Sequence, residues 1–482
     1  MQVTLGRKKL KKPLREYLPC WLTNVHSLFY FYGLLVVLGV IFFAYTLFDN
    51  YFVTAFTGDY CAQQFSFYTN GYDDWWHFFK TGEFVLYDEN TFLGVNNLGS
   101  NSFYYLLDPF FLPILMFPRQ IVPQGMAVLT IFKMATAGLM FFYYINYMGA
   151  SRTSSKISAI AYAFSGWTAW YLWFNHFTEI TIVFPLILLG IERILREKKP
   201  WLLMVSICLM GFVNYFFCIC FVFCAFLYAM FRYFQRIREN NWKNNLVILG
   251  IGFLGFAVGL LMATSAMAPG IATALNSSRA ETSNYAKELV AALKAAKFKD
   301  VFKLLTVWGE DTTYNYRNQA RPFYFLIELM YPVMSDRGVP LLDYHNQYGS
   351  YDNVAGSLYV YIPILMMFVP ALIKSTRKKH FAPLIATVLF IFAILTPFFY
   401  YVFFGFTQPY SRWFLFPVAC LITYSGLYLD QFVEDEKPWT LEVSAGVLLV
   451  LAIVAGIFSS YAGADCPPVR PGEQHNGFPG DG

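Results

Sequence analysis

Charged side chains are scarce in this chain. Only 13% of its 482 residues are charged, whereas 57% are hydrophobic and 20% aromatic, and this balance excludes an ordinary soluble domain. The net charge of +5 does not indicate a nucleic-acid partner, because the basic residues form short clusters between apolar runs, where orientation in a membrane explains them better. The composition predicts a polytopic membrane protein whose partner is the lipid bilayer, with no nucleic acid.

Motifs for nucleotides, disulfides and metals are also lacking. The sequence has no P-loop, no GxGxxG after an expected strand and no CxxC pair, so ATP-driven transport and nucleotide cofactors have no support. Half of the eight cysteines fall in one expected membrane hairpin and form no disulfide framework. The pairs Asp73-Asp74 and Asp88-Glu89 offer the oxygen ligands that a divalent cation prefers. Paired acids are common in loops, so we expect no metal and no cofactor, and leave a divalent cation open.

What the chain does have is a series of apolar runs. The first, Leu28 to Leu47, is uncharged and long enough to cross a bilayer. Similar segments lie near 28–48, 125–148, 156–174, 177–194, 201–215, 216–232, 244–264, 356–373, 380–403, 411–431 and 440–461. The predicted fold is an all-α polytopic membrane protein with about 11 transmembrane helices and two outer-face loop regions.

Lysine and arginine indicate the orientation. After the basic first segment, they cluster on its side of the membrane at Arg152/Lys156, Arg193/Arg196/Lys198/Lys199, Arg232/Arg236/Arg238/Lys243 and Lys374/Arg377/Lys378/Lys379. Basic loops face the cytoplasm, so the N-terminus is predicted to be cytoplasmic and the active site to face outside the cell membrane. The same rule makes Tyr104 to Phe117 a re-entrant or interfacial helix, and Trp201 to Arg232 a hairpin of two short helices that turns near Asn214.

The expected organisation has seven parts: a cytoplasmic basic tail (1–27), a first span (28–48), a large outer loop (49–124), a helical core (125–264), a second outer region (265–355), C-terminal spans (356–461) and a disordered tail (462–482). The abrupt composition of the tail also fits a truncated chain or a reading-frame error. In the second outer region, Tyr285 to Val301 has the apolar spacing of one amphipathic helix. Such a helix lies on the bilayer surface, caps a cavity or packs structurally.

Two charged residues are candidates for chemistry. Asp59 follows the first span closely, where a carboxylate can take a proton from an acceptor hydroxyl; the alternative is a helix cap or a solvated loop acid. Lys133 lies about two turns into an apolar helix, where a charge costs roughly 2.5 to 3.5 kcal/mol. That cost indicates function, with snorkelling to the outer headgroups as the alternative.

Other polar residues are expected at the same outer level. Asn175, His176 and Glu179 belong to the tight turn between the third and fourth spans, and Arg412 and Trp413 lie where the tenth begins. Taken singly, a buried histidine is usually structural and an arginine beside a tryptophan is usually an interfacial anchor. Together these groups suit the phosphate of a lipid-linked substrate, which Arg and Lys bind strongly where water is scarce.

An ordered set of motifs resembles the YfhO family of bacterial membrane proteins over about residues 20 to 435. The motifs are Gly58-Asp59-Tyr60, Gln63-Gln64, Gly94-Val95-Asn96-Asn97, Tyr104-Tyr105-Leu106-Leu107-Asp108-Pro109, Lys133, Asn214-Tyr215-Phe216, Ser278-Arg279 and Ser411-Arg412-Trp413. The resemblance implies a glycosyltransferase of the GT-C superfamily, which transfers a sugar from a polyprenyl-phosphate carrier to a cell-envelope polymer or glycolipid, such as teichoic acid.

The resemblance also implies roles for single residues. Asp59 is the expected catalytic base. The expected ligands of the carrier phosphate are Lys133, Arg412, His176 and Arg279. The remaining substrate contacts are expected from Gln63, Gln64, Asn96, Asn97, Tyr104, Asp108, Glu179 and Asn214.

Two other classes of protein stay open at this point. A transporter or flippase of a lipid-linked sugar also needs basic residues near a headgroup, although it more often has inverted repeats and helices broken at the midplane. A non-catalytic membrane scaffold leaves Lys133 unexplained. An enzyme requires Asp59 and the basic cluster to converge at the outer leaflet, whereas a transporter requires access from both sides.

Overall fold

The computed structural model describes residues 28–49, 51–54, 60–89, 91, 93–237, 240–276, 284–306, 329–330, 358–406, 410–435 and 438–464. Their helices are α2 (Leu28–Asp49), α3 (Phe65–Thr81), α4 (Asn97–Asn101), α5 (Val122–Met148), α6 (Arg152–Ala163), α7 (Gly166–Trp170), α8 (Thr178–Glu197), α9 (Trp201–Val213), α10 (Tyr215–Arg236), α11 (Trp242–Leu275), α12 (Asn284–Lys294), α13 (Phe298–Thr306), α15 (Ile362–Arg377), α16 (Ala382–Leu395), α17 (Pro397–Val402), α18 (Leu415–Asp435) and α19 (Pro438–Ala464). Two short strands, β1 (Tyr87–Asp88) and β2 (Val95–Asn96), pair antiparallel.

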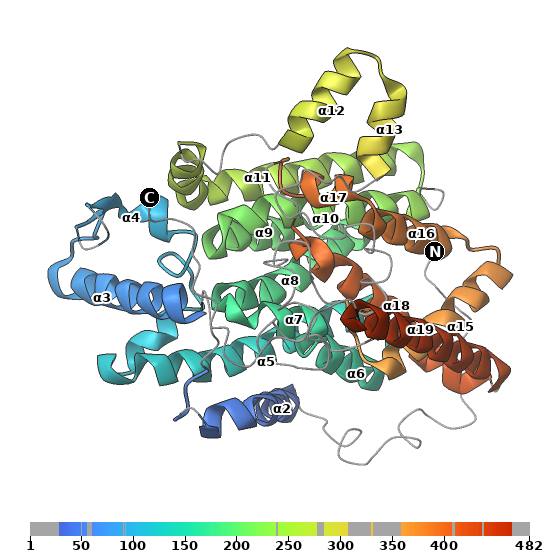
Figure 1. The fold of residues 1–482 in the computed structure, drawn as a ribbon, viewed down its shortest axis with the longest axis horizontal. Helices are drawn as coiled ribbons and strands as arrows, with labels where there is room; N and C mark the ends of the chain where they lie inside the picture. Colours follow the sequence, from blue (N-terminus) through green and yellow to red (C-terminus); the bar gives the residue numbers. More distant parts are fainter. Residues whose placement is uncertain are drawn as a thin grey trace.

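The helices form a layered bundle. In Figure 1, α2, α5, α8, α9 and α11 follow one another across the molecule, and each contacts the next. Helices α15, α18 and α19 pack together on the other side of the bundle, and α3 and α4 lie at one end. The pair α12 and α13 projects from the edge.

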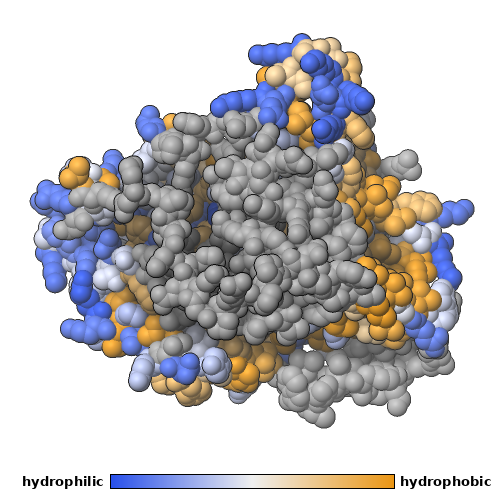
Figure 2. Space-filling view, viewed as in Figure 1, coloured by the Kyte–Doolittle hydropathy of each residue, from blue (hydrophilic) through white to orange (hydrophobic). Residues whose placement is uncertain are grey.

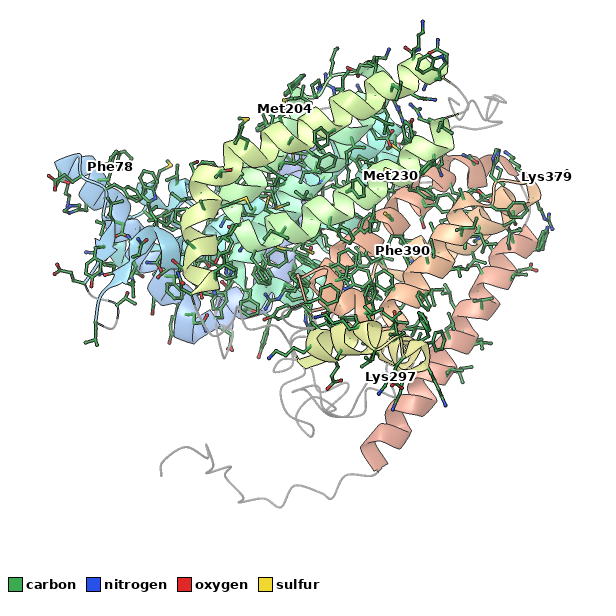
Figure 3. All side chains as sticks on the ribbon, turned by 90° about the horizontal axis from the view of Figure 1, so that it is seen from above. Phe78, Met204, Met230, Lys297, Lys379 and Phe390 are labelled. Carbon is green, nitrogen blue, oxygen red and sulfur yellow. The ribbon has the colours of Figure 1, made fainter. Side chains whose placement is uncertain are left out.

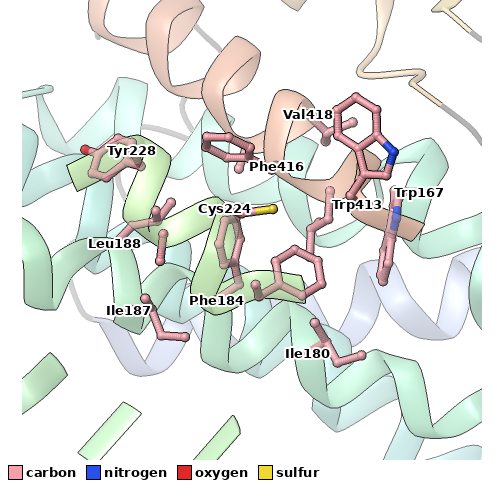
Figure 4. Packing of buried hydrophobic residues seen from close by; sticks show 14 of the residues in the cluster. Trp167, Ile180, Phe184, Ile187, Leu188, Cys224, Tyr228, Trp413, Phe416 and Val418 are labelled. Carbon is pink, nitrogen blue, oxygen red and sulfur yellow. The ribbon is translucent and has the colours of Figure 1, made fainter. Parts of the chain in front are cut away.

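Helix α8 is the centre of the core. Fifteen of its twenty residues are buried, as expected of a helix that is covered by neighbours all round. Figure 4 shows Phe184 and Leu188 of α8 among side chains of α10 and α18, including Cys224 and Phe416. A helix this central places Glu179, in its first turn, inside the protein.

Glycines let several helices approach closely. A Cβ added at Gly190 of α8 would lie 2.7 Å from the backbone nitrogen of Leu203 in α9, and one at Gly259 of α11 would lie 2.8 Å from Ile207. Small residues at helix contacts are typical of membrane proteins, where close packing drives association. The α8–α9–α11 stack therefore depends on positions without side chains.

The membrane-protein character predicted from the sequence is supported by the helices. Within the described residues, five are long and apolar enough to cross a membrane: Leu28–Asp49, Arg119–Met148, Tyr215–Arg236, Trp242–Leu275 and Arg412–Phe432. Shorter apolar helices are Trp201–Val213, Ala382–Leu395 and Trp439–Val454. The count of eleven crossings and the GT-C-like arrangement stay predictions. Figure 2 shows hydrophobic surface around α16, and hydrophilic residues over α3 and over the α12–α13 pair.

Several expected boundaries are corrected. The third expected span, 156–174, is broken, because α6 ends at Ala163 and the chain continues through the short helix α7. The expected span 380–403 is divided at Thr396, which has an extended backbone between α16 and α17. The predicted turn near Asn214 is present between α9 and α10. The division of the chain into seven parts stays a prediction.

Two expected helices outside the spans are wrong in form. Tyr104 to Phe117 is a series of turns that ends in the 3₁₀ segment Leu112–Met116, not one helix. Tyr285 to Val301 falls in two helices, because α12 ends at Lys294 and α13 begins at Phe298. Ala296, between them, has φ +53°, which a continuous helix does not allow. An unforeseen amphipathic helix, α3, instead forms the main element of the first outer region.

Candidate functional site

A buried ion pair joins α5 to α8. Lys133 Nζ donates to Glu179 Oε1, and the two side chains are 3% and 0% exposed. The ammonium also lies over the rings of Tyr68 and Tyr105, at 5.7 and 5.9 Å from their centroids. Burial of a charge is tolerated when a partner neutralises it, and this pairing favours the interior role of Lys133 over snorkelling to headgroups.

Asp108 belongs to the same cluster. Its Oδ1 accepts a hydrogen bond from the backbone N–H of Phe110 at 2.9 Å, and the residue is 2% exposed. Its Oδ2 and the Oε2 of Glu179 are buried and have no donor among the described residues. Asp108 and Glu179 interact electrostatically with each other and with Lys133. Two such oxygens can accept from a hydroxyl or hold a proton.

Gln64, just before α3, links Tyr105 to the turn before α8. Its Oε1 accepts from the hydroxyl of Tyr105 and lies 2.9 Å from Nδ1 of His176. A donor at Nδ1 leaves Nε2 of His176 with a lone pair. That atom and Nε2 of Gln64 are buried without partners among the described residues. Nε2 of His176 can therefore accept a hydrogen bond, and Nε2 of Gln64 can donate one, to a ligand or a water molecule.

Arg412 lies beside this turn in an aromatic cage. Its guanidinium carbon is 4.1 Å from the ring centroid of Tyr410, 5.0 Å from that of Phe177, 5.3 Å from that of Phe174 and 5.9 Å from that of Phe216. Its Nε is buried without a hydrogen-bond partner in the part of the chain that the structure describes. Phe174 and Phe177 flank Asn175 and His176, so Arg412 is next to the Gln64–His176 pair.

Asn214 and Tyr104 complete the surroundings. The Asn214 side chain accepts from the backbone N–H of Phe217 at 3.1 Å, which caps α10, and donates to the carbonyl of Phe103 at 3.0 Å. The hydroxyl of Tyr104 donates to Oε1 of Gln63 at 3.3 Å, and its ring centroid is 5.0 Å from that of His176. The bond from Asn214 to Phe103 ties the segment before α5 to the α9–α10 turn.

Asn96 and Asn97 lie elsewhere, in the subdomain formed by α3, α4 and the β1–β2 hairpin. Asn96 accepts from the N–H of Gly99 at 2.7 Å as the cap of α4, and Asn97 donates to Oδ2 of Asp74 at 2.8 Å. Their bonds organise the contact of α3 with the β1–β2 hairpin. The structure does not bring them to Lys133, and their role as substrate contacts stays a prediction.

The acid pairs line an open cleft of about 340 Å³ in this subdomain, together with His77. Burial raises the pKa of Asp74 above its ordinary value, and the hydrogen bond from Asn97 opposes the rise. Asp73 forms two bonds of 2.8 Å with the Arg119 guanidinium. Among the described residues, no three His, Cys, Asp or Glu side chains gather as a metal site.

Asp59 and Arg279 lie outside the described residues. Their roles as base and phosphate ligand stay predictions. Tyr60, the next described residue after Asp59, is 1% exposed and packs in the hydrophobic cluster that contains Tyr68 and Tyr105.

Tyr68 was not expected at this cluster, whereas Asn175 was expected beside His176 and Glu179 without a separate role. Tyr68 follows Gln64 by four residues, the spacing that puts two side chains on one helix face, and this signal was readable. Asn175 donates to the hydroxyl of Thr130 at 2.6 Å, and its Oδ1 is buried without a partner among the described residues. Thr130 is less than one turn from Lys133, so Asn175 belongs to the cluster.

The sequence of residues 31–299 matches the family described as "Bacterial membrane protein YfhO". This match covers more than half of the chain. The chain belongs to the YfhO family. The family assignment confirms the resemblance drawn from the ordered motifs and supports a membrane location.

One relative within the YfhO family is the "Uncharacterized protein YfhO" of Bacillus subtilis (strain 168). It is 24% identical to this chain over 142 residues, which are 28% of this chain and 16% of the relative. The chain thus matches well under two thirds of that relative's length. No solved structure matches the chain.

Proposed function

We propose that this YfhO family protein is a membrane glycosyltransferase. It transfers a sugar from a polyprenyl-phosphate carrier to a cell-envelope acceptor, such as teichoic acid or a glycolipid, on the outer side of the membrane. Family membership supports a glycosyltransferase-like role in the cell envelope, and the motif resemblance supplies the donor and the acceptor.

One observation supports the phosphate-linked donor more than any other. Arg412 has no ion pair among the described residues, although it is held by four aromatic rings beside the buried polar cluster of Gln64, His176, Asn175 and Glu179. Native proteins rarely leave so many buried polar atoms without partners, and a ligand or water is the usual explanation. A guanidinium with free donors in an environment poor in water binds a phosphate group strongly.

The proposed reaction needs a base and an anion-stabilising group. Asp59 takes the proton from the acceptor hydroxyl, whose oxygen forms the new bond to the anomeric carbon as the bond from that carbon to the carrier's phosphate oxygen breaks. The electron pair of the broken bond stays on the phosphate, and Arg412 stabilises that developing charge. Lys133 is held by Glu179, so its contribution is the positive end of a polarised pair beside the phosphate.

The test uses purified protein in proteoliposomes that contain a labelled polyprenyl-phosphate sugar and an acceptor glycolipid. Asp59→Asn is expected to lower the rate of sugar transfer on the order of 10²- to 10⁴-fold, which is the usual contribution of a general base. Asp49→Asn is the matched control, because Asp49 is an exposed acid at the end of the same first span. Equal activity in Asp59→Asn and the wild-type protein would move the base elsewhere.

The phosphate-binding role of Arg412 is tested by two substitutions, Arg412→Gln and Arg412→Lys. Arg412→Gln removes the charge and is expected to lower the rate on the order of 10²- to 10³-fold, as loss of one oxyanion donor does. Arg412→Lys keeps the charge but loses the planar group that stacks on aromatic rings, so its rate should fall between the two. Full activity in Arg412→Gln would remove the phosphate role.

A flippase of a lipid-linked sugar is the second candidate function, because two of the expected spans are interrupted helices. The helical backbone is interrupted between α6 and α7 and again between α16 and α17. Helices interrupted in this way are typical of transporters. The same proteoliposomes separate the two functions. Movement of intact labelled lipid between leaflets without sugar release would support the flippase and overturn the transferase.

A further inference from the structure

Helices α12 and α13 form a hairpin that is anchored on one face. The ring of Tyr285 stacks on that of Tyr401 in α17, with 4.2 Å between centroids and 6° between planes. The Tyr285 hydroxyl donates to the carbonyl of Leu304 at 2.9 Å, which joins α12 to α13. Leu289 is buried in the same small cluster. These contacts fix the hairpin against the end of the α16–α17 segment.

The hairpin also exposes large apolar side chains. Phe298 and Phe302, four residues apart on α13, are 76% and 68% exposed. Val290 and Leu293, three residues apart on α12, are 47% and 54% exposed. These spacings put each pair on one helix face, so the hairpin carries an apolar stripe that no described residue covers.

The rim of this stripe is basic. Lys287, Lys294, Lys297, Lys299 and Lys303 are all exposed, against Glu288 and Asp300, which gives five positive and two negative charges, a net charge of +3. Charged residues are depleted from the core of protein interfaces because they lose water there. Phenylalanines mixed with lysines are instead the composition of helices that lie in a membrane interface, where the lysines remain with the headgroups.

The position of the hairpin fits this composition. It follows α11, a 34-residue candidate span, and packs on α17 at the end of an apolar helix. Figure 1 shows the hairpin projecting from the upper edge of the helix bundle, and Figure 3 labels Lys297 on it. A hairpin placed at the end of membrane helices meets the lipid surface that surrounds them.

We propose that the α12–α13 hairpin is an interfacial anchor that binds the bilayer surface at this end of the spans. Phe298 and Phe302 insert among the lipid chains just below the headgroups, and Lys294, Lys297, Lys299 and Lys303 bind anionic headgroups. The partner is an anionic lipid surface, and the anchor requires neither sugar transfer nor any other activity of the protein.

The test places a nitroxide spin label at single cysteines of a variant whose eight native cysteines are replaced. Labels at Phe298→Cys and Phe302→Cys in bilayers that contain phosphatidylglycerol should collide preferentially with oxygen, which concentrates in lipid. A label at Asp300→Cys, about 160° around α13 from Phe302, should collide preferentially with a water-soluble nickel complex. Because all three positions are exposed, the substitutions leave the packing intact.

The lipid charge is tested separately. Changing Lys294, Lys297, Lys299 and Lys303 to Gln should move the Phe302 label toward the nickel complex and abolish any difference between phosphatidylglycerol bilayers and purely zwitterionic ones. Two outcomes would overturn the proposal. In one, the Phe302 label prefers the nickel complex in every bilayer. In the other, the label is shielded from both reagents, including in detergent, because another part of the protein covers the stripe.

Discussion

The sequence marks Lys133 as a candidate site residue but does not identify its partner. A charged lysine inside an apolar membrane helix costs free energy, and for this reason the sequence alone indicates that Lys133 has a function. Its partner Glu179 lies 46 residues later on α8, and only folding brings the two together. The ion pair leaves Arg412 as the cation of this cluster without an ion pair among the described residues.

The Lys133–Glu179 pair gives a prediction for stability. Removing one partner leaves a buried charge unpaired, so Lys133→Met or Glu179→Met should each lower the free energy of unfolding by roughly 3 to 5 kcal/mol. The double variant Lys133→Met/Glu179→Met should recover most of the loss, because an apolar pair of similar volume is often neutral. Thermal and denaturant unfolding in detergent measures both. Additive losses in the double variant would contradict the pairing.

At the scale of elements, α8 is fixed at both ends by buried carboxylates. Glu179 in its first turn pairs with Lys133 of α5. Glu192, 0% exposed, accepts from Arg232 Nε at 2.5 Å and from the Tyr228 hydroxyl at 2.9 Å, both on α10. The two acids are 13 residues apart, which is about 20 Å along the helix at 1.5 Å per residue. This arrangement fixes the position of α8 along its axis as well as its rotation.

Two glycines of α11 test whether helix packing depends on close approach. Gly259→Ala puts a methyl group 2.8 Å from Ile207 and 3.0 Å from the carbonyl of Met204, so it should lower the free energy of unfolding by about 1 to 3 kcal/mol through overpacking. Gly250→Ala is the matched control, because its added Cβ meets nothing within 4 Å. It should be neutral or stabilise by up to about 1 kcal/mol through helix propensity. Equal effects of the two changes in thermal unfolding would show that the contact of α9 with α11 is looser than described.

The whole molecule has two polar ends separated by apolar helices. Figure 3 places Phe78 of α3 and Lys379, which follows α15, at opposite ends. On α8, the Lys133 cluster lies at the first end, where Glu179 is in the first turn, and Arg196 and Arg232 gather around Glu192 toward the second. The positive-inside rule assigns the second end to the cytoplasm, which would open the Arg412 cluster to the outer side.

This orientation is tested by labelling single cysteines in intact cells. In a variant without native cysteines, Leu93→Cys should react with a membrane-impermeant maleimide, because Leu93 is 99% exposed in the first outer region. Lys199→Cys, exposed at the other end, should react only after the cells are permeabilised. The reverse pattern would invert the topology and place the candidate site in the cytoplasm.

Sequence alone determined the class of the protein, the apolar first helix and the turn at Asn214, and it singled out Lys133, His176 and Arg412 as candidate site residues. Each of these follows from a local property: an apolar run, a polar residue between two short helices, or a charge among apolar neighbours. The ordered motifs also determined the family. Such signals are readable because lipid penalises every exposed charge and every unpaired backbone group.

Tertiary structure decided which of these residues meet. It paired Lys133 with Glu179, placed Gln64 against His176 and surrounded Arg412 with four rings. It also set Asn96 and Asn97 apart, beside α3 and the β1–β2 hairpin. It also divided the amphipathic segment at Ala296 into two helices. Pairing between distant residues depends on how helices stack and rotate about their axes. That stacking is set by many weak contacts such as those of Gly190 and Gly259, which no single segment of sequence specifies.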